Sequence, residues 1–101
     1  MLILKKEPGG VFYAKDIPNT LDAMQDEIGG YIEIVGYSRH CVLVCDEEGR
    51  LKDLPYNTTI AGTDYVGPVF FCGTEENRYG EEEFCDAPGF IQACLEGKEG
   101  L

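Results

Sequence analysis

The sequence contains no apolar run close to the roughly 18 to 20 residues that a membrane span needs. Its first residues, 1–7, hold an apolar run of four residues followed by Lys5 and Lys6. That order is the reverse of a signal peptide, in which positive charge precedes a longer apolar core. We therefore expect a cytoplasmic protein with no membrane partner.

Phosphate-binding signatures are also missing. Neither G-x-G-x-x-G nor the P-loop pattern G-x-x-x-x-G-K-[ST] occurs, which argues against dinucleotide binding in a Rossmann-type fold. Basic residues are scarce, with 8 Lys and Arg against 19 Asp and Glu and a formal net charge of -11. Because phosphate contacts need clustered Lys and Arg, direct binding to nucleic acid is disfavoured.

Groups for catalysis are few. The only histidine is His40, and nothing around the cysteines resembles a nucleophile motif, so no acid, base and nucleophile set can be assembled. The cysteine count is odd and includes no Cys-x-x-Cys pair, which favours free thiols in a reducing compartment over a disulfide scaffold. The five cysteines are Cys41, Cys45, Cys72, Cys85 and Cys94.

Cys41 and Cys45, beside His40, come nearest to a metal-binding pattern. On a strand their side chains share one face but lie about 13 Å apart, whereas zinc ligands converge to about 2.0 to 2.3 Å from one point. The sequence therefore predicts no metal site, no cofactor and no catalytic residue. A pairing of His40 with one of the later cysteines in the folded chain stays open.

The periodicity of apolar residues predicts a single domain over residues 1–101 with one clear helix. That helix follows an N-cap at Asn19 or Thr20, keeps apolar residues at helical spacing as far as Ile28, and ends at Gly29-Gly30. Residues 88–95 predict a short C-terminal helix, and residues 97–101 a frayed tail.

Five segments have the composition of strands. They are residues 1–6, 11–15, 31–35, 41–45 and 65–72. The almost wholly apolar segment Cys41–Cys45 is typical of a central strand buried on both faces, whereas Pro68 indicates an edge strand or a bulge. A short return segment is expected from Arg50, and irregular structure at residues 54–57. The predicted fold is α+β, with a mainly antiparallel sheet of about five strands, one well-defined helix packed on it and a short C-terminal helix.

The run Gly29–Val35, with Asn19–Leu21 before it and Val44–Leu51 after it, resembles a family of small bacterial and phage proteins catalogued as domain of unknown function 3846. Leu54–Asn57 and the strand ending in Phe71-Cys72-Gly73 are similar to it too. The resemblance covers roughly residues 1 to 73. It implies a compact α+β fold and a home in phages, mobile elements or gut-type bacteria, and it brings no catalytic residues.

The negative charge is concentrated in the second half of the chain. Residues 1–45 hold six acids and four bases, a net charge of −2, and residues 46–101 hold thirteen acids and four bases, a net charge of −9. An acidic surface can imitate the phosphates of nucleic acid and occupy a basic groove, although a charge run is more often a solvated loop. The predicted partner-binding residues are Asp46, Glu47, Glu48, Glu75, Glu76, Glu81, Glu82, Glu83 and Asp86.

The leading hypothesis is a non-enzymatic binding protein of phage or mobile-element type. It would inhibit a host nucleic-acid-handling or defence protein by covering a basic surface with the two acidic segments, residues 46–48 and 75–86. The alternative is a small-ligand, nucleotide-type binding protein, in which tyrosines and Arg39 or Arg78 would line a pocket. An enzyme is the third hypothesis, and the oligomeric state is not predicted.

Overall fold

The computed structural model describes residues 1–96 of the chain, so the predicted tail at residues 97–101 lies outside the described residues. The strands are β1 (Leu2–Lys6), β2 (Tyr13–Asp16), β3 (Ile32–Ser38), β4 (Cys41–Asp46), β5 (Tyr56–Ile60), β6 (Thr63–Val66), β7 (Val69–Glu76) and β8 (Glu82–Cys85). The helices are α1 (Leu21–Ile28) and α2 (Gly89–Glu96). None of the helices within residues 1–96 is long and apolar enough to cross a membrane.

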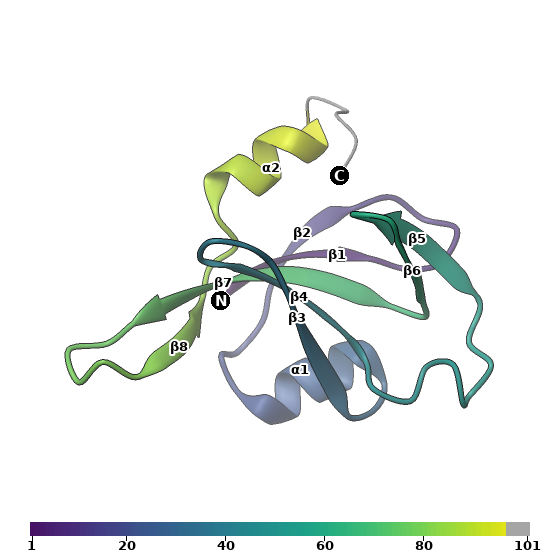
Figure 1. The fold of residues 1–101 in the computed structure, drawn as a ribbon, viewed down its shortest axis with the longest axis horizontal. Coiled ribbons are helices and arrows are strands. Elements are labelled where there is room, and N and C mark those ends of the chain that lie inside the picture. The colour runs from purple at the N-terminus through teal and green to yellow at the C-terminus, as the bar shows by residue number, and fades with distance from the viewer. Residues whose placement is uncertain (97–101) are drawn as a thin grey trace.

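Six strands form one sheet in the order β2-β1-β7-β4-β3, and β8 joins it by pairing with β7 (Figure 1). The strands β5 and β6 form a separate hairpin. Every strand pair in the described residues is antiparallel. The predicted α+β fold with a mainly antiparallel sheet is confirmed, although its strands outnumber the five expected.

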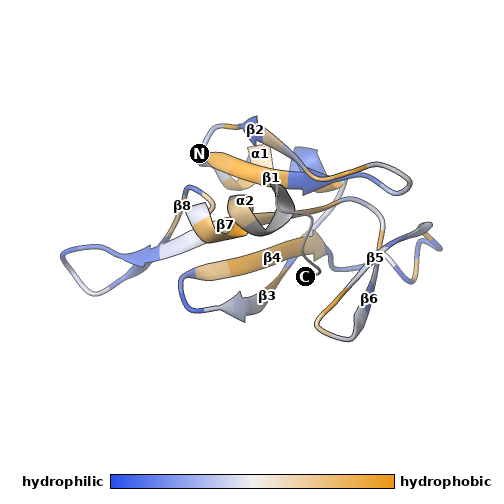
Figure 2. Cartoon of the chain, turned by 90° about the horizontal axis from the view of Figure 1, so that it is seen from above, coloured by the Kyte–Doolittle hydropathy of each residue, from blue (hydrophilic) through white to orange (hydrophobic). Residues whose placement is uncertain are grey.

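Side chains alternate between the two faces of a strand, so each face of the sheet carries apolar side chains. Both faces are covered by other elements. On one face α1 packs Met24 and Ile28 against Val44 and Phe70. On the other face the β5–β6 hairpin and α2 complete a second cluster, which includes Leu43, Phe71, Ile60 and Ile91. The central strands are the apolar ones in Figure 2. All six residues of β4 are buried, which confirms the predicted central strand.

Helix α1 begins and ends as the sequence predicts. The Thr20 hydroxyl accepts a hydrogen bond of 3.1 Å from the Ala23 amide, and Gly29 closes the helix in the left-handed conformation, with φ 85°. A short polar side chain at the N-cap and a glycine at the C-terminus satisfy backbone groups that the helix leaves free. The helix is tied to the sheet by Glu27, whose carboxylate pairs with Lys5 of β1 and Lys15 of β2.

The predicted strand at residues 65–72 is wrong in two respects. It divides at Gly67, where φ is 72°, so Tyr65 and Val66 end β6 while β7 begins at Val69. In addition, β7 lies between β1 and β4 in the interior of the sheet. The prediction of an edge or bulge fails because Pro68 precedes the ladder, where its missing N–H removes no strand hydrogen bond.

Two further expectations differ from the structure. Residues 54–57, expected to be irregular, run into β5 at Tyr56, and residues 50–53 form turns in place of a return segment. The buried Asn57 side chain fixes the start of β5, because its amide nitrogen donates to the carbonyls of Lys6 and Gly67 at 2.8 and 2.7 Å. These bonds join segments far apart in the sequence, so no local pattern could indicate them.

Candidate functional site

The acidic segment at residues 75–86 is a β-hairpin. Strand β7 is buried from Val69 to Thr74, and its last two residues, Glu75 and Glu76, are exposed. Strand β8 pairs with β7 alone, so the hairpin projects from the end of the sheet (Figure 1). The central sheet thus holds a strongly charged arm at one end.

The tip of this arm is organised by Asn77. Its side-chain oxygen accepts hydrogen bonds from the amides of Tyr79, at 2.8 Å, and Glu81, at 3.0 Å. Its side-chain nitrogen donates to the carboxylates of Glu81 and Glu83. Gly80 supplies the positive φ, 77°, that the turn requires. Asparagine at the first and glycine at the fourth position is typical of a tight turn, and the Gly80 amide closes this one by donating to the Asn77 carbonyl at 3.0 Å. This local signal could have indicated the hairpin.

The hairpin register sets like charges against each other. Glu75 lies opposite Glu83, and Glu76 lies opposite Glu82. Residues that face each other across an antiparallel pair have Cβ atoms about 4.5 to 5.5 Å apart, and like charges there are destabilising. The arm therefore holds two carboxylate pairs at a cost in stability that the fold tolerates.

The described lysines do not neutralise this arm, because each is engaged elsewhere. Lys5 and Lys15 pair with Glu27, and Lys52 pairs with Asp46 at 2.8 Å. Lys6 donates to the carbonyl and the side chain of Asn57. Arg78, at the tip, packs on the ring of its neighbour Tyr79 and donates to its hydroxyl at 2.9 Å.

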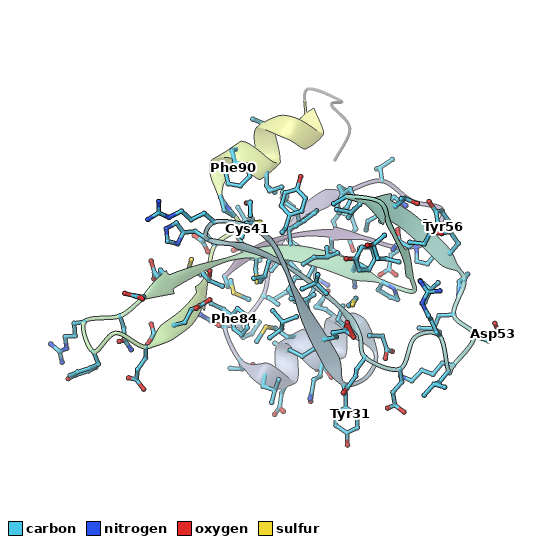
Figure 3. The ribbon with its side chains drawn as sticks, in the orientation of Figure 1. Tyr31, Cys41, Asp53, Tyr56, Phe84 and Phe90 are labelled. Carbon is cyan, nitrogen blue, oxygen red and sulfur yellow. The ribbon has the colours of Figure 1, made fainter. Side chains whose placement is uncertain are left out.

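The other predicted acidic segment lies at the opposite end of the sheet. Cys41, the first residue of β4, pairs with Gly73 next to the hairpin, whereas Asp46 is the last residue of β4. Five residues of strand separate them by about 17 Å. Figure 3 shows Asp53, in the turn that follows this segment, at the far side of the molecule from the hairpin. The two segments do not form one surface.

Two of the predicted partner-binding residues are bonded to parts of the domain outside the hairpin. The side chain of Asp46 is only 1% exposed. It pairs with Lys52 and accepts a hydrogen bond of 2.8 Å from the Glu48 amide. Asp86 accepts a hydrogen bond of 2.7 Å from the Leu2 amide. The remaining members of the predicted set are exposed, namely Glu47, Glu48, Glu75, Glu76, Glu81, Glu82 and Glu83.

Three of the thiols considered for catalysis or metal binding lie in the core, and Cys85 is half-buried. Cys41, Cys45 and Cys72 are buried. Burial raises the pKa of the Cys41 and Cys45 thiols to about 11, and that of Cys72 to about 12. A thiol with so high a pKa is a poor nucleophile at neutral pH. The side chain of Cys94 lies outside the described part.

The single histidine directly precedes Cys41, and the two residues line the same surface hollow. His40 is an exposed turn residue with φ 64°. Within residues 1–96, no group of three or more His, Cys, Asp or Glu residues is arranged to hold a metal ion.

The tyrosines considered as pocket residues are dispersed over the molecule. Tyr37 and Tyr65 line a cavity of about 130 Å³, and Tyr65 also lines one of about 190 Å³ beside Arg50. Both cavities are smaller than the roughly 300 to 1,000 Å³ typical of small-molecule sites. Tyr31 borders a wider hollow of about 490 Å³ near α1.

A larger hollow, of about 510 Å³, lies at the base of the acidic hairpin. Arg39 and His40 line it together with Glu75, Glu76 and Glu82. Three carboxylates would repel the phosphates of a nucleotide at close range. The surroundings of Arg39 therefore suit a cation better than an anion.

Comparison with known proteins places the chain in a family. A family model described as domain of unknown function DUF3846 matches residues 1–96. The match extends beyond residue 73, where the sequence resemblance ended, and it includes the acidic hairpin. Searches of curated proteins and of solved structures found no match. Because the family model covers nearly the whole sequence, this chain belongs to the DUF3846 family.

Proposed function

We propose that this chain is a non-enzymatic binding protein whose β7–β8 hairpin docks onto a basic surface of a partner protein. The partner would be a host protein that handles nucleic acid or acts in defence, and this chain would inhibit it. In this proposal the chain is encoded by a phage or mobile element and acts in the cytoplasm. The observation that carries the proposal is the pair of like-charged contacts, Glu75 with Glu83 and Glu76 with Glu82.

The hairpin is chosen as the contact surface because its register sets carboxylates opposite carboxylates. A loop that only keeps a protein soluble can spread its charges. Here Asn77 orders the turn and binds the Glu83 carboxylate, and the strand register sets the acidic residues opposite each other. A cationic partner surface would relieve their repulsion on binding, so electrostatic complementarity would speed association and strengthen the complex. The exposed aromatic ring of Tyr79, 71% accessible at the tip, adds apolar area to the contact.

The hairpin alone, without residues 46–48, makes up the proposed contact surface. Asp46 is buried and paired with Lys52, and Glu47 and Glu48 lie beyond the far end of β4. A partner with an interface of ordinary size can therefore bind the hairpin without covering residues 46–48 at the other end of β4. We therefore narrow the proposed surface to Glu75, Glu76, Glu81, Glu82 and Glu83.

Capture of partners from host lysate tests this proposal. The hairpin variant changes Glu75, Glu76, Glu82 and Glu83 to Gln, and a matched control changes the exposed Asp22, Asp26, Glu47 and Glu48 to their amides, which removes the same formal charge. We expect the hairpin variant to lose at least about tenfold of the captured partner, since several exposed ion pairs of modest strength add up, while the control retains it.

Salt provides the second readout. Exposed charges are screened over about 8 Å at 0.15 M salt and over about 3 Å at 1 M, so capture should decline steeply between those concentrations. Capture that persists unchanged in 1 M salt, or an equal loss in the hairpin variant and the control, would overturn the proposal.

A further inference from the structure

The hollow at the base of the hairpin is lined in part by Gly36, which has no side chain. The hollow lies between the β3–β4 turn and the start of the β7–β8 hairpin, and the Thr74 amide joins the two by donating to the His40 carbonyl at 3.0 Å. A Cβ atom built on Gly36 would meet nothing within 4 Å. A larger residue at position 36 would therefore extend into open space at the wall of the hollow.

One carboxylate pair borders this hollow from the α1 side of the sheet. Glu76 and Glu82 lie opposite each other, as do Thr74 and Phe84 two residues away. Residues two apart on a strand share a face, and Phe84 packs on the core cluster beneath α1. Glu76 and Glu82 thus project on the same face as Thr74, and all three line the hollow together with Gly36 and Val42.

Thr74 supplies a feature that is independent of the acidic residues. Only 8% of this residue is exposed, and its hydroxyl forms no side-chain hydrogen bond with another of the described residues. Every fully buried side-chain polar atom in residues 1–96 has a hydrogen-bond partner. Because the Thr74 hydroxyl has none, it must be partly accessible from outside the core. Thr74 lines the hollow, and its hydroxyl has a free position for a ligand. A hydroxyl can accept or donate a hydrogen bond, and the two carboxylates beside it favour a ligand that carries hydrogen-bond donors.

We infer that this hollow binds the guanidinium group of an arginine side chain contributed by the partner. The inference rests on the proposed function and names the group that anchors it. A guanidinium is planar and offers five N–H donors in a fixed fork, so it can bind both Glu76 and Glu82 and still donate to the Thr74 hydroxyl. The ammonium group of lysine is a compact point charge, so it is less suited to binding two carboxylates and a hydroxyl at the same time.

Arg39 is the one arginine among the residues that line the hollow, and no lysine lines it. Its guanidinium makes no ion pair within 4.0 Å among the described residues. It would repel an incoming guanidinium and would attract a phosphate. The variant Arg39→Ala therefore separates the two ligand classes. Binding of an arginine probe should strengthen in this variant, and a phosphate ligand would bind more weakly.

Nuclear magnetic resonance titration of the whole chain with capped arginine, N-acetyl-arginine-methylamide, tests the inference. Saturable shifts should appear at the amides of Gly36, Val42 and Thr74, and capped lysine should bind several-fold more weakly. Gly36→Leu should weaken binding, because it places a bulky side chain at the wall of the hollow. Thr74→Val should weaken binding about tenfold, as expected for one hydrogen bond from a charged donor.

The matched control is Gly89→Leu, because Gly89 also has nothing within 4 Å of its Cβ position and lies outside the hollow. Thermal unfolding of each variant confirms that it folds, and Gly36→Val replaces Gly36→Leu if the larger residue prevents folding. Unchanged binding in the folded Gly36 variant, equal binding of capped lysine, or tighter binding of pyrophosphate than of arginine would overturn the inference.

Capture of the partner from lysate distinguishes failure of the arginine site from failure of the proposed function. If the hairpin Gln variant loses the partner while Gly36→Leu keeps it, the acidic surface stands and the arginine site is refuted. If the hairpin variant keeps the partner, the proposed function itself fails. Loss of the partner in both variants, with the Gly89→Leu control unaffected, supports the two proposals together.

Discussion

Glu76 lies directly opposite Glu82 across the β7–β8 ladder, with no described lysine paired to either carboxylate. This like-charge contact has a thermodynamic consequence that does not depend on any partner. Sheets gain stability from cross-strand pairs of opposite charge and lose it where like charges face each other.

The single variants Glu76→Gln and Glu82→Gln should therefore stabilise the protein. We expect the free energy of unfolding to rise by about 0.2 to 1 kcal/mol for either change, and the gain should shrink in high salt because screening weakens the repulsion. Urea unfolding at low and high ionic strength measures it. Glu47→Gln, in an exposed turn, is the control, and a loss of stability in the hairpin variants would contradict the explanation.

Glu27 should make stability depend on pH in the acid range. Burial acts to raise its pKa, but hydrogen bonds from Lys15 and Lys5 outweigh burial and lower the pKa below its ordinary value of 4.5. The unfolded chain then takes up this proton at a higher pH than the folded chain, so stability is present above pH 4.5 and is lost as pH falls through the lower folded value.

Replacing the Glu27 carboxylate with an amide tests whether this residue causes the pH dependence of stability. Glu27→Gln should destabilise the protein at pH 7 by about 1.5 to 3 kcal/mol, the range for hydrogen bonds to a charged group. The larger cost of an uncompensated buried charge does not apply, because Lys5 keeps its bridge to Glu7. The variant should also flatten the acid limb of the stability curve. Asp26→Asn, on the exposed side of the same helix, is the control. Unfolding curves from pH 3 to 7 give both quantities, and an unchanged slope would refute the assignment.

Gly73 should not tolerate a side chain. A Cβ atom there would collide with the Asp86 carbonyl oxygen and would lie 2.9 Å from the Cys85 sulfur. Gly73→Ala should lower the free energy of unfolding by about 1 to 3 kcal/mol or more, the range for overpacking a close-packed site. Gly36→Ala, where the same atom meets open space, should be neutral or stabilising. Equal effects of the two variants would contradict the packing explanation.

The core thiols should resist alkylation. Because burial raises the pKa of Cys41 and Cys45 from 9.0 to about 11, the thiolate fraction at pH 8 falls about hundredfold, before steric protection is counted. Iodoacetamide labelling followed by peptide mass spectrometry should find these two sites unmodified in the folded protein and fully modified in urea. Rapid labelling of the native protein at either site would show that the strand opens locally.

Local sequence was enough for those elements whose cause is local. Thr20 and Gly29 bound α1 because a capping hydroxyl and a left-handed glycine act within one turn of the helix. The run Cys41–Cys45 indicated a strand buried on both faces because only a central position can hide so many consecutive apolar residues. The α+β composition followed from these segments.

The proposed contact surface could not be predicted to the same degree. The acids at 75–86 were visible in the sequence, but their face-to-face pairing depends on the register set by the turn at Asn77 and Gly80. The same sequence signal selected Asp46, which the structure buries against Lys52. Charge in a sequence predicts exposure on average, whereas an ion pair between residues six positions apart needs the folded turn to form.

The sequence by itself determined the net charge, its concentration after residue 45, the limits of α1 and the buried character of β4, since each follows from composition or from interactions a few residues apart. Only the tertiary structure decided that β7 lies inside the sheet, that its two last residues leave the sheet as an acidic arm, and that the two acidic segments lie at opposite ends of β4. Strand order depends on contacts between residues far apart in the chain, which compete across the whole fold and leave no local trace.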